Sequence, residues 1–159
     1  MNIDRSVFIA DGAKVIGNVI IKELSSVWFN AVIRGDSSTI EIGKRTNIQD
    51  NVVIHTSKNS KVIIGDNVTI GHGAIVHGCS IGNNVLIGMG AIILDNAIIG
   101  DNCIIGAGSL ITQNKIIPSG SVVFGNPYKI ARKITDEEIN HIIWNANEYV
   151  NEAKMYINI

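Results

Sequence analysis

Aliphatic residues recur along this chain at every sixth position, a spacing that fits neither an amphipathic helix nor a simple alternating strand. The clearest run extends from Ile81 to Ile111, and several of its members are followed by glycine. Each six-residue unit predicts one short strand and one corner, and three units close a coil of about eighteen residues. The same grid runs through the N-terminal half at Ile9, Val15, Ile21, Val27, Ile33, Ile42, Ile48, Ile54, Ile64, Ile70 and Val76.

Stacked coils of this kind share backbone hydrogen bonds at a spacing of about 4.8 Å and enclose the aliphatic positions. The repeat resembles that of the left-handed β-helix, or hexapeptide-repeat, proteins. The left hand is what this resemblance implies, since parallel crossovers are usually right-handed. The predicted fold is therefore all-β, a left-handed parallel β-helix of hexapeptide repeats with a C-terminal α-helix.

The C-terminal helix is predicted from a change of period. Thr135 and Glu138 have the spacing of a capping box, and apolar residues then follow helical spacing, which predicts a helix over 136–157. We expect a single domain, with the β-helix over 1–134 and the segment 135–159 packed on its outside.

The six-residue grid slips three times, and these slips are where function is expected. The interval is nine residues from Ile33 to Ile42, ten from Ile54 to Ile64, and five from Val76 to Ile81. The residues of chemical interest inside the irregular units are Arg34, Asp36, His55 and His77, and His72 lies in the unit just before the last slip.

Counting whole units predicts which of these side chains stack. The units that begin at Ile33, Ile54 and Val76 are three apart, so Arg34, His55 and His77 should form one column. By the same count Asp50 should lie next to His72 on a second face. The three histidines thus divide between two edges of the prism.

Two stacked imidazoles can bind a divalent metal through their ring nitrogens. A threefold-symmetric trimer would bring His72 of one subunit beside His55 and His77 of its neighbour. Three imidazoles with an open fourth position are typical of a catalytic zinc site, in which the pKa of the bound water falls toward 7.

The sequence resembles the γ-class carbonic anhydrases and their close relatives over nearly its whole length. The paired His72 and His77 in a glycine-rich setting carry the most specific part of the resemblance. The matching segments are Arg34-Gly35-Asp36, Thr46-Asn47-Ile48-Gln49-Asp50, His55, Gly71 to Cys79, Leu86 to Ala91, Gly106 to Leu110, and Gly125-Asn126-Pro127.

This resemblance implies a homotrimer with zinc, or iron or cobalt, held between subunits by His55, His72 and His77, and no organic cofactor. It implies an inter-subunit ion pair of Arg34 with Asp50 or Asp36. As catalytic residues it implies Gln49, whose amide would orient the hydroxide or CO₂, together with Tyr149 and Asn151 on the terminal helix.

The function predicted first is reversible hydration of CO₂ to bicarbonate by metal-bound hydroxide. In place of the acidic loop of the founding members, the chain has Thr56-Ser57-Lys58-Asn59-Ser60-Lys61, and Ser37 replaces a glutamate, so activity is expected to be weak. Two alternatives stay open. One is a hexapeptide acyltransferase or thioesterase acting on CoA esters, and the other is a metal-binding trimer without catalysis.

Composition narrows the setting of the protein. The net charge of −1 gives no attraction to nucleic acid or anionic membranes, and no apolar run reaches the roughly 20 residues of a membrane span. Sixteen glycines favour tight corners. The two cysteines, Cys79 and Cys103, occupy small-residue positions of the repeat and are expected to pack in the core, and the expected location is the cytoplasm.

Overall fold

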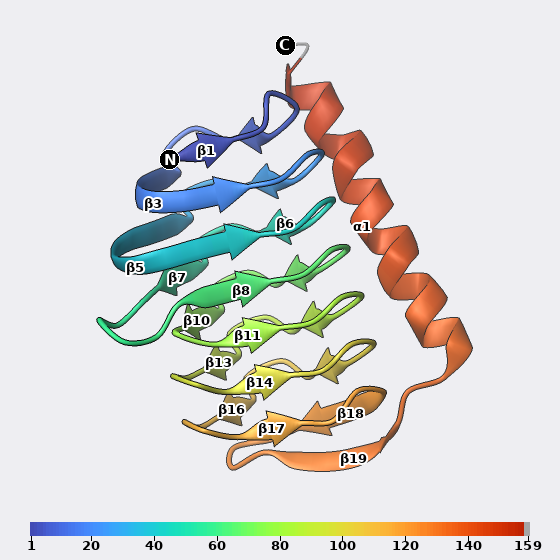
Figure 1. Ribbon diagram of the computed structural model, residues 1–159. Helices are drawn as coiled ribbons and strands as arrows, with labels where there is room; N and C mark the ends of the chain where they lie inside the picture. Colours follow the sequence, from blue (N-terminus) through green and yellow to red (C-terminus); the bar gives the residue numbers. More distant parts are fainter. Residues whose placement is uncertain (158–159) are drawn as a thin grey trace.

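The computed structural model describes residues 1–157 and has the predicted architecture, a parallel β-helix accompanied by one C-terminal helix (Figure 1). In Figure 1 the front strands run from left to right, the chain returns behind them, and successive coils descend from the N-terminal end. This path is left-handed, as the hexapeptide repeat indicated. The segment predicted to pack on the outside of the β-helix extends to residue 159, and its residues 158 and 159 lie outside the described residues.

Three faces make up the prism, and two long strands bend across the corner between the first and second. These are β3 (Lys14–Ile21) and β5 (Val32–Ile42), and β5 pairs with β7 at its start and with β8 at its end. The first face continues with β7 (Val53–His55), β10 (Ile75–His77), β13 (Ile92–Ile93) and β16 (Leu110–Ile111). The second face contains β1 (Asn2–Ile3), β8 (Val62–Ile64), β11 (Ser80–Ile81), β14 (Ile98–Ile99) and β17 (Ile116–Ile117).

The third face is the one that the helix covers. Its parallel strands end in an antiparallel pair at the C-terminal coil. They are β2 (Phe8–Ile9), β4 (Ser26–Val27), β6 (Asn47–Ile48), β9 (Thr69–Ile70), β12 (Leu86–Ile87), β15 (Ile104–Ile105), β18 (Ser121–Phe124) and β19 (Lys129–Lys133).

From Ile21 onward, the interior of the prism is a stack of aliphatic side chains at the positions that the six-residue grid predicted, whereas Ile9 at the N-terminal end is exposed. Ile33, Ile54, Val76 and Ile93 are consecutive partners on the first face, and all four are fully buried. A single such side chain buried from water contributes about 1.5–3 kcal/mol of hydrophobic stabilisation. The aliphatic ladder therefore both stabilises the fold and fixes the register of the polar residues attached to it.

Asparagine, as well as glycine, occupies the left-handed backbone conformation at the corners. Asn67, Asn84 and Asn102 have φ between 53° and 55°, and their side chains form a hydrogen-bonded ladder. The glycine after an aliphatic position has a different role. A Cβ on Gly88 would lie 2.4 Å from the backbone nitrogen of Ala107 on the next coil, so glycine is required there for close stacking.

The helix α1 (Asp136–Ile157) matches the predicted limits and runs back along the whole stack from the C-terminal coils (Figure 1). It contacts β2, β4 and β9. An aromatic cluster fastens its C-terminal half, where Trp28 lies edge-on to Tyr149 and Tyr156 with ring centroids 5.5 and 5.4 Å apart. No helix within residues 1–157 is both long enough and apolar enough to cross a membrane.

A capping box begins the helix as predicted. The Glu138 N–H donates to Thr135 Oγ1 at 3.2 Å, and the Thr135 N–H donates to Glu138 Oε2 at 3.0 Å. Arg132 donates two hydrogen bonds of 2.8 Å to the same carboxylate. Arg132, followed by the Thr135 N–H, lowers the pKa of Glu138 to about 2.

Thr135→Ala is expected to lower the free energy of unfolding by about 1 kcal/mol, because it leaves a helix N–H without its side-chain acceptor. Denaturant unfolding followed by circular dichroism measures the loss, with Thr112→Ala, outside the helix, as the control. Equal unfolding free energies for Thr135→Ala and Thr112→Ala would contradict the role of the cap.

The Glu138 carboxylate favours folding above its unfolded pKa near 4.5, and this contribution should disappear as the pH falls toward 2.

Candidate metal centre

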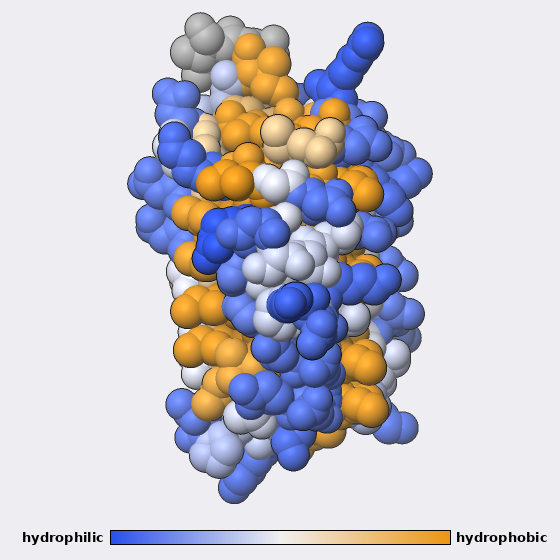
Figure 2. Space-filling view, turned by 60° about the vertical axis from the view of Figure 1, so that its left-hand side comes forward, coloured by the Kyte–Doolittle hydropathy of each residue, from blue (hydrophilic) through white to orange (hydrophobic). Residues whose placement is uncertain are grey.

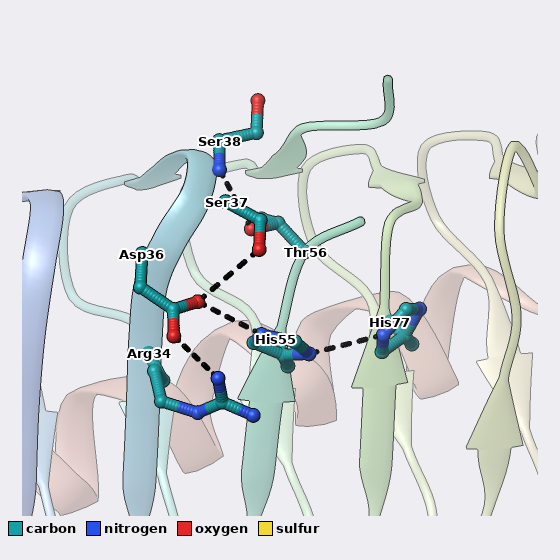
Figure 3. A network of polar contacts seen from close by, with 7 residues as sticks. All are labelled: Arg34, Asp36, Ser37, Ser38, His55, Thr56 and His77. Carbon is teal, nitrogen blue, oxygen red and sulfur yellow. Dashed lines mark hydrogen bonds and ion pairs between the residues drawn. The ribbon is translucent and has the colours of Figure 1, made fainter. Parts of the chain in front are cut away.

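Arg34, His55 and His77 form the predicted column at the corner between the first and second faces (Figure 3). Arg34 on β5 is the register partner of His55 on β7, and His55 is the partner of His77 on β10. The stacked register places the three side chains in neighbouring coils. The interpretation by unit counting is therefore confirmed for this column.

The two histidines of the column turn ring nitrogens toward each other. His55 Nδ1 and His77 Nε2 are 3.1 Å apart, and the ring centroids are 5.1 Å apart (Figure 3). A contact between two ring nitrogens needs a proton between them, since a neutral imidazole has one donor and one acceptor nitrogen. A cation bound by both lone pairs could replace that proton.

A carboxylate occupies the remaining ring nitrogen of each histidine of the column. Asp36 Oδ1 lies 3.0 Å from His55 Nε2, and Asp95 Oδ1 lies 2.6 Å from His77 Nδ1. Asp36 also forms an ion pair with Arg34 in the same chain at 2.5 Å. Arg34, and then His55, lower the pKa of Asp36 to about 2, so this carboxylate is ionised at neutral pH.

The third candidate ligand lies at a different corner, as the unit count predicted. His72 Nδ1 is 2.9 Å from Asp50 Oδ2, and the Gly73 N–H donates to the Asp50 carbonyl at 2.9 Å. Across the described part of the chain, no three histidine, cysteine or acidic side chains converge as a complete metal site. One chain thus brings two imidazoles together and holds the third elsewhere.

The donor chemistry nevertheless fits a divalent metal. Each of the three histidines has one ring nitrogen on a carboxylate, which is the outer contact that metal-binding histidines commonly make. The other nitrogen remains for a ligand. Cys79 is unsuited to join them, because burial and then the Asp95 charge raise the pKa of its thiol to about 12.

Gln49 is buried beside His72 and belongs to a chain of side-chain hydrogen bonds. Its Oε1 accepts from the His72 N–H at 3.2 Å, and its Nε2 donates to Asn47 Oδ1 at 3.1 Å. The amide of Asn47 in turn donates to Thr69 Oγ1 at 2.9 Å, and so does the amide of Asn145 on α1. The orientation of the Gln49 amide is therefore set on both sides.

A cavity of about 370 Å³ opens in front of these hydrogen-bonded side chains, between the third face and α1. Gln49, His72 and Tyr149 supply polar atoms to its wall, while Ile87 and Met89 are among its apolar residues. Burial raises the pKa of Tyr149, so its hydroxyl is protonated and able to donate at neutral pH.

The structure does not bring Asn151 to this cavity. Its side chain is exposed and donates to Glu148 Oε1 on the helix at 3.3 Å. Asn145 lines the cavity instead, and the sequence analysis did not select it. Helical spacing from Tyr149 could have identified Asn145 from the sequence. Residues four apart, such as Asn145 and Tyr149, share a helix face, whereas residues two apart, such as Tyr149 and Asn151, do not.

Asp95 is a second candidate site residue that was not singled out from the sequence. Its unit begins at Ile93, which is the register partner of Val76, so it lies one coil beyond His77. By the unit count, Leu94 falls beside His77 and Asp95 falls beside Gly78, so the count alone does not pair Asp95 with His77. Only a side chain directed along the stack separates this contact from an ordinary corner residue.

The chain is similar in sequence to hexapeptide-repeat proteins and to carbonic anhydrases. Residues 78–113 match the family described as bacterial transferase hexapeptide (six repeats). A Methanocaldococcus jannaschii protein named "probable carbonic anhydrase" is 56% identical over 148 residues, covering 93% of both chains. The mitochondrial γ carbonic anhydrase 2 of Arabidopsis thaliana is 45% identical over 97% of this chain, which spans 58% of that relative's length.

A solved structure shows the same likeness in three dimensions. A hexapeptide transferase family protein from Anaplasma phagocytophilum superposes with a TM-score of 0.93 at 42% identity. The match covers 98% of this chain and 92% of the other.

Proposed function

Since the chain belongs to the γ-carbonic anhydrase family of hexapeptide-repeat proteins, we propose that it is a metal-dependent enzyme for the reversible hydration of CO₂ to bicarbonate. The metal site would lie between the subunits of a homotrimer. His55 and His77 of one subunit and His72 of its neighbour would hold the metal.

The observation that carries this proposal is the facing pair of ring nitrogens. His55 Nδ1 and His77 Nε2 lie 3.1 Å apart, and each ring is held from behind by a carboxylate. His72 has the same carboxylate support from Asp50 but belongs to another corner. A rotation that joins the two corners of neighbouring subunits completes a set of three imidazoles, the ligand number of catalytic zinc sites.

The surface beside the histidine column supports a subunit interface. Val53 and Ile75 are register partners two residues before His55 and His77, and both are exposed. Ile98 and Ile116 form a second exposed stack on the next face. Figure 2 shows apolar side chains in columns on both sides of a polar stripe, a pattern that is costly in water and favours burial against another chain.

Zinc suits three imidazole ligands, and iron and cobalt suit them as well. When bound, such a cation supplies a Lewis acid that makes water acidic near neutral pH. Gln49 would orient the reacting oxygen or CO₂, because its amide is fixed by Asn47 and the His72 N–H and a primary amide retains further donor and acceptor capacity. Arg34 would hold Asp36 against His55 and, at the interface, strengthen the contact between subunits.

The test is a CO₂ hydration assay on protein whose metal content and mass have both been measured. The protein is prepared anaerobically and loaded separately with zinc and with iron, and native mass spectrometry reports the trimer. Metal-loaded trimers of both kinds that hydrate CO₂ no faster than buffer would reject the proposed activity and leave a metal-binding trimer without catalysis.

Turnover is expected to rise with the concentration of an imidazole buffer. The segment 56–61 contains no carboxylate and is closed into a tight turn by the Ser57 and Ser60 backbones, so no acidic side chain there can pass protons to solvent. Stopped-flow rates at constant pH and ionic strength measure this effect, with bulky buffers for comparison. A kcat independent of the buffer would show that another route removes the proton.

The cavity favours one alternative function. At about 370 Å³ with a mainly apolar wall, it has room for the acyl group of a CoA ester, and a transferase family protein shares the fold. Thermal stabilisation of the protein by CoA, combined with release or transfer of an acyl group, would support this reading over CO₂ hydration.

A further inference from the structure

His77 has a carboxylate partner on the coil that follows it. Asp95 lies at the corner after β13, where the Asn96 N–H donates to the Gly78 carbonyl at 2.8 Å. The Asp95 carbonyl accepts from the Asn114 N–H at 3.0 Å. The corner is thus fixed to the coils on both sides, and its carboxylate projects along the stack onto the histidine.

The contact between Asp95 and His77 is short and partly shielded from water. Asp95 Oδ1 lies 2.6 Å from His77 Nδ1, and each side chain keeps 29% of its surface exposed. An ionised carboxylate only accepts hydrogen bonds, so His77 must present a protonated Nδ1 to it. The lone pair of a neutral His77 is then on Nε2, the nitrogen that faces His55 Nδ1.

The turn over 56–61 supplies a second contact to the same oxygen. Ser60 Oγ donates to Asp95 Oδ1 at 3.3 Å, and Ser57 Oγ lies 2.5 Å from Ser60 Oγ. Gly78 leaves the space that this meeting needs, because a Cβ there would lie 2.1 Å from Asp95 Oδ1 and 2.2 Å from Ser60 Oγ. Two segments distant in sequence, the turn with Ser60 and the strand end with His77, therefore converge on one carboxylate oxygen of a third.

We propose that Asp95 is a positioning residue that holds His77 in the tautomer and ring orientation whose Nε2 is free to bind the metal. The turn over 56–61 serves this arrangement by directing Ser60 at the Asp95 carboxylate. The expected effect on metal binding rests on the proposed function, whereas the tautomer and orientation of the His77 ring can be tested without a metal. Outer-shell partners of this kind typically change metal affinity by about 10- to 100-fold.

The experiment compares Asp95→Ala, Asp95→Asn and the control Asp101→Ala. Asp101 occupies an equivalent Asp-Asn corner and accepts from the Asn83 N–H at 2.6 Å, but its partner is no histidine. Zinc affinity is measured on each purified trimer by competition with a chelator. We expect a loss of about 10- to 100-fold for Asp95→Ala, a smaller loss for Asp95→Asn, and wild-type affinity for Asp101→Ala.

A second readout needs neither metal nor activity. Nitrogen-15 NMR of the metal-free protein in alkaline solution reports which nitrogen of neutral His77 carries the proton. Wild-type protein should show Nδ1–H, and Asp95→Ala should move toward the Nε2–H form that free histidine prefers.

An unchanged His77 tautomer and an unchanged zinc affinity in Asp95→Ala would overturn the proposal. Wild-type protein that shows the expected tautomer but binds no metal would instead contradict the proposed function and leave the positioning of His77 supported. Ser60→Ala should weaken zinc binding less than Asp95→Ala does, and no weakening would remove the turn from the arrangement.

Discussion

Protein in which His77 is replaced by alanine is expected to bind no metal at the proposed site and to hydrate CO₂ no faster than buffer. The substitution removes Nε2, which lies 3.1 Å from His55 Nδ1, and leaves each interface with two imidazoles instead of three. Two neutral nitrogen ligands hold a divalent cation weakly compared with three, and the geometry of a catalytic site is lost. Metal analysis of the purified protein and a stopped-flow CO₂ assay measure the two effects.

The control is His141→Ala. His141 lies on α1, where its ring stacks on Trp144 with the centroids 5.2 Å apart, far in the fold from the histidine column. It should keep wild-type metal content and rate. His77 is partly exposed at the end of β10 and is not part of the aliphatic core, so the trimer and the thermal unfolding midpoint should survive its loss, which separates a site residue from a scaffold residue. Full metal content and rate in His77→Ala would contradict the proposed ligand set.

The fold and the columns of the candidate site followed from the sequence because both are properties of the backbone register. Buried positions such as Ile33 and Ile54 begin units that are three apart, although a slip lengthens one unit between them, so counting units amounts to counting coils. The adjacency of Arg34 to His55 and of His55 to His77 is a direct consequence of that count. The slips in the grid marked these positions because a purely structural repeat has no reason to be interrupted there.

What the sequence did not predict depends on where side chains point and how the helix is rotated. Asp95 looked like any corner residue, and only its carboxylate reaching 2.6 Å to His77 distinguishes it. The rotation of α1 is set by Trp28 packing against Tyr149, which places Asn145 over the cavity and turns Asn151 to solvent. Periodicity along one chain contains no information about that tertiary contact.

Mixing two inactive variants is expected to restore activity if the site is shared between subunits. His72→Ala retains an intact column, and His55→Ala retains an intact His72, so each should be inactive alone. In a hybrid trimer, an interface that combines the column of the first with His72 of the second contains all three imidazoles. Unfolding and refolding an equal mixture should therefore recover CO₂ hydration and bound metal.

The size of the recovery follows from symmetry. Each threefold interface uses the column of one subunit and His72 of the next, so random assembly gives about one quarter complete sites. A mixture of His55→Ala with His77→Ala is the matched control, because both defects lie in the same column and no pairing can repair it. Native mass spectrometry should show hybrid trimers in both mixtures. Recovery in neither mixture, with hybrids present, would mean that the three histidines do not meet between subunits. Recovery near one quarter in the first mixture alone would place the metal between neighbouring subunits, held by the column of one and by His72 of the other.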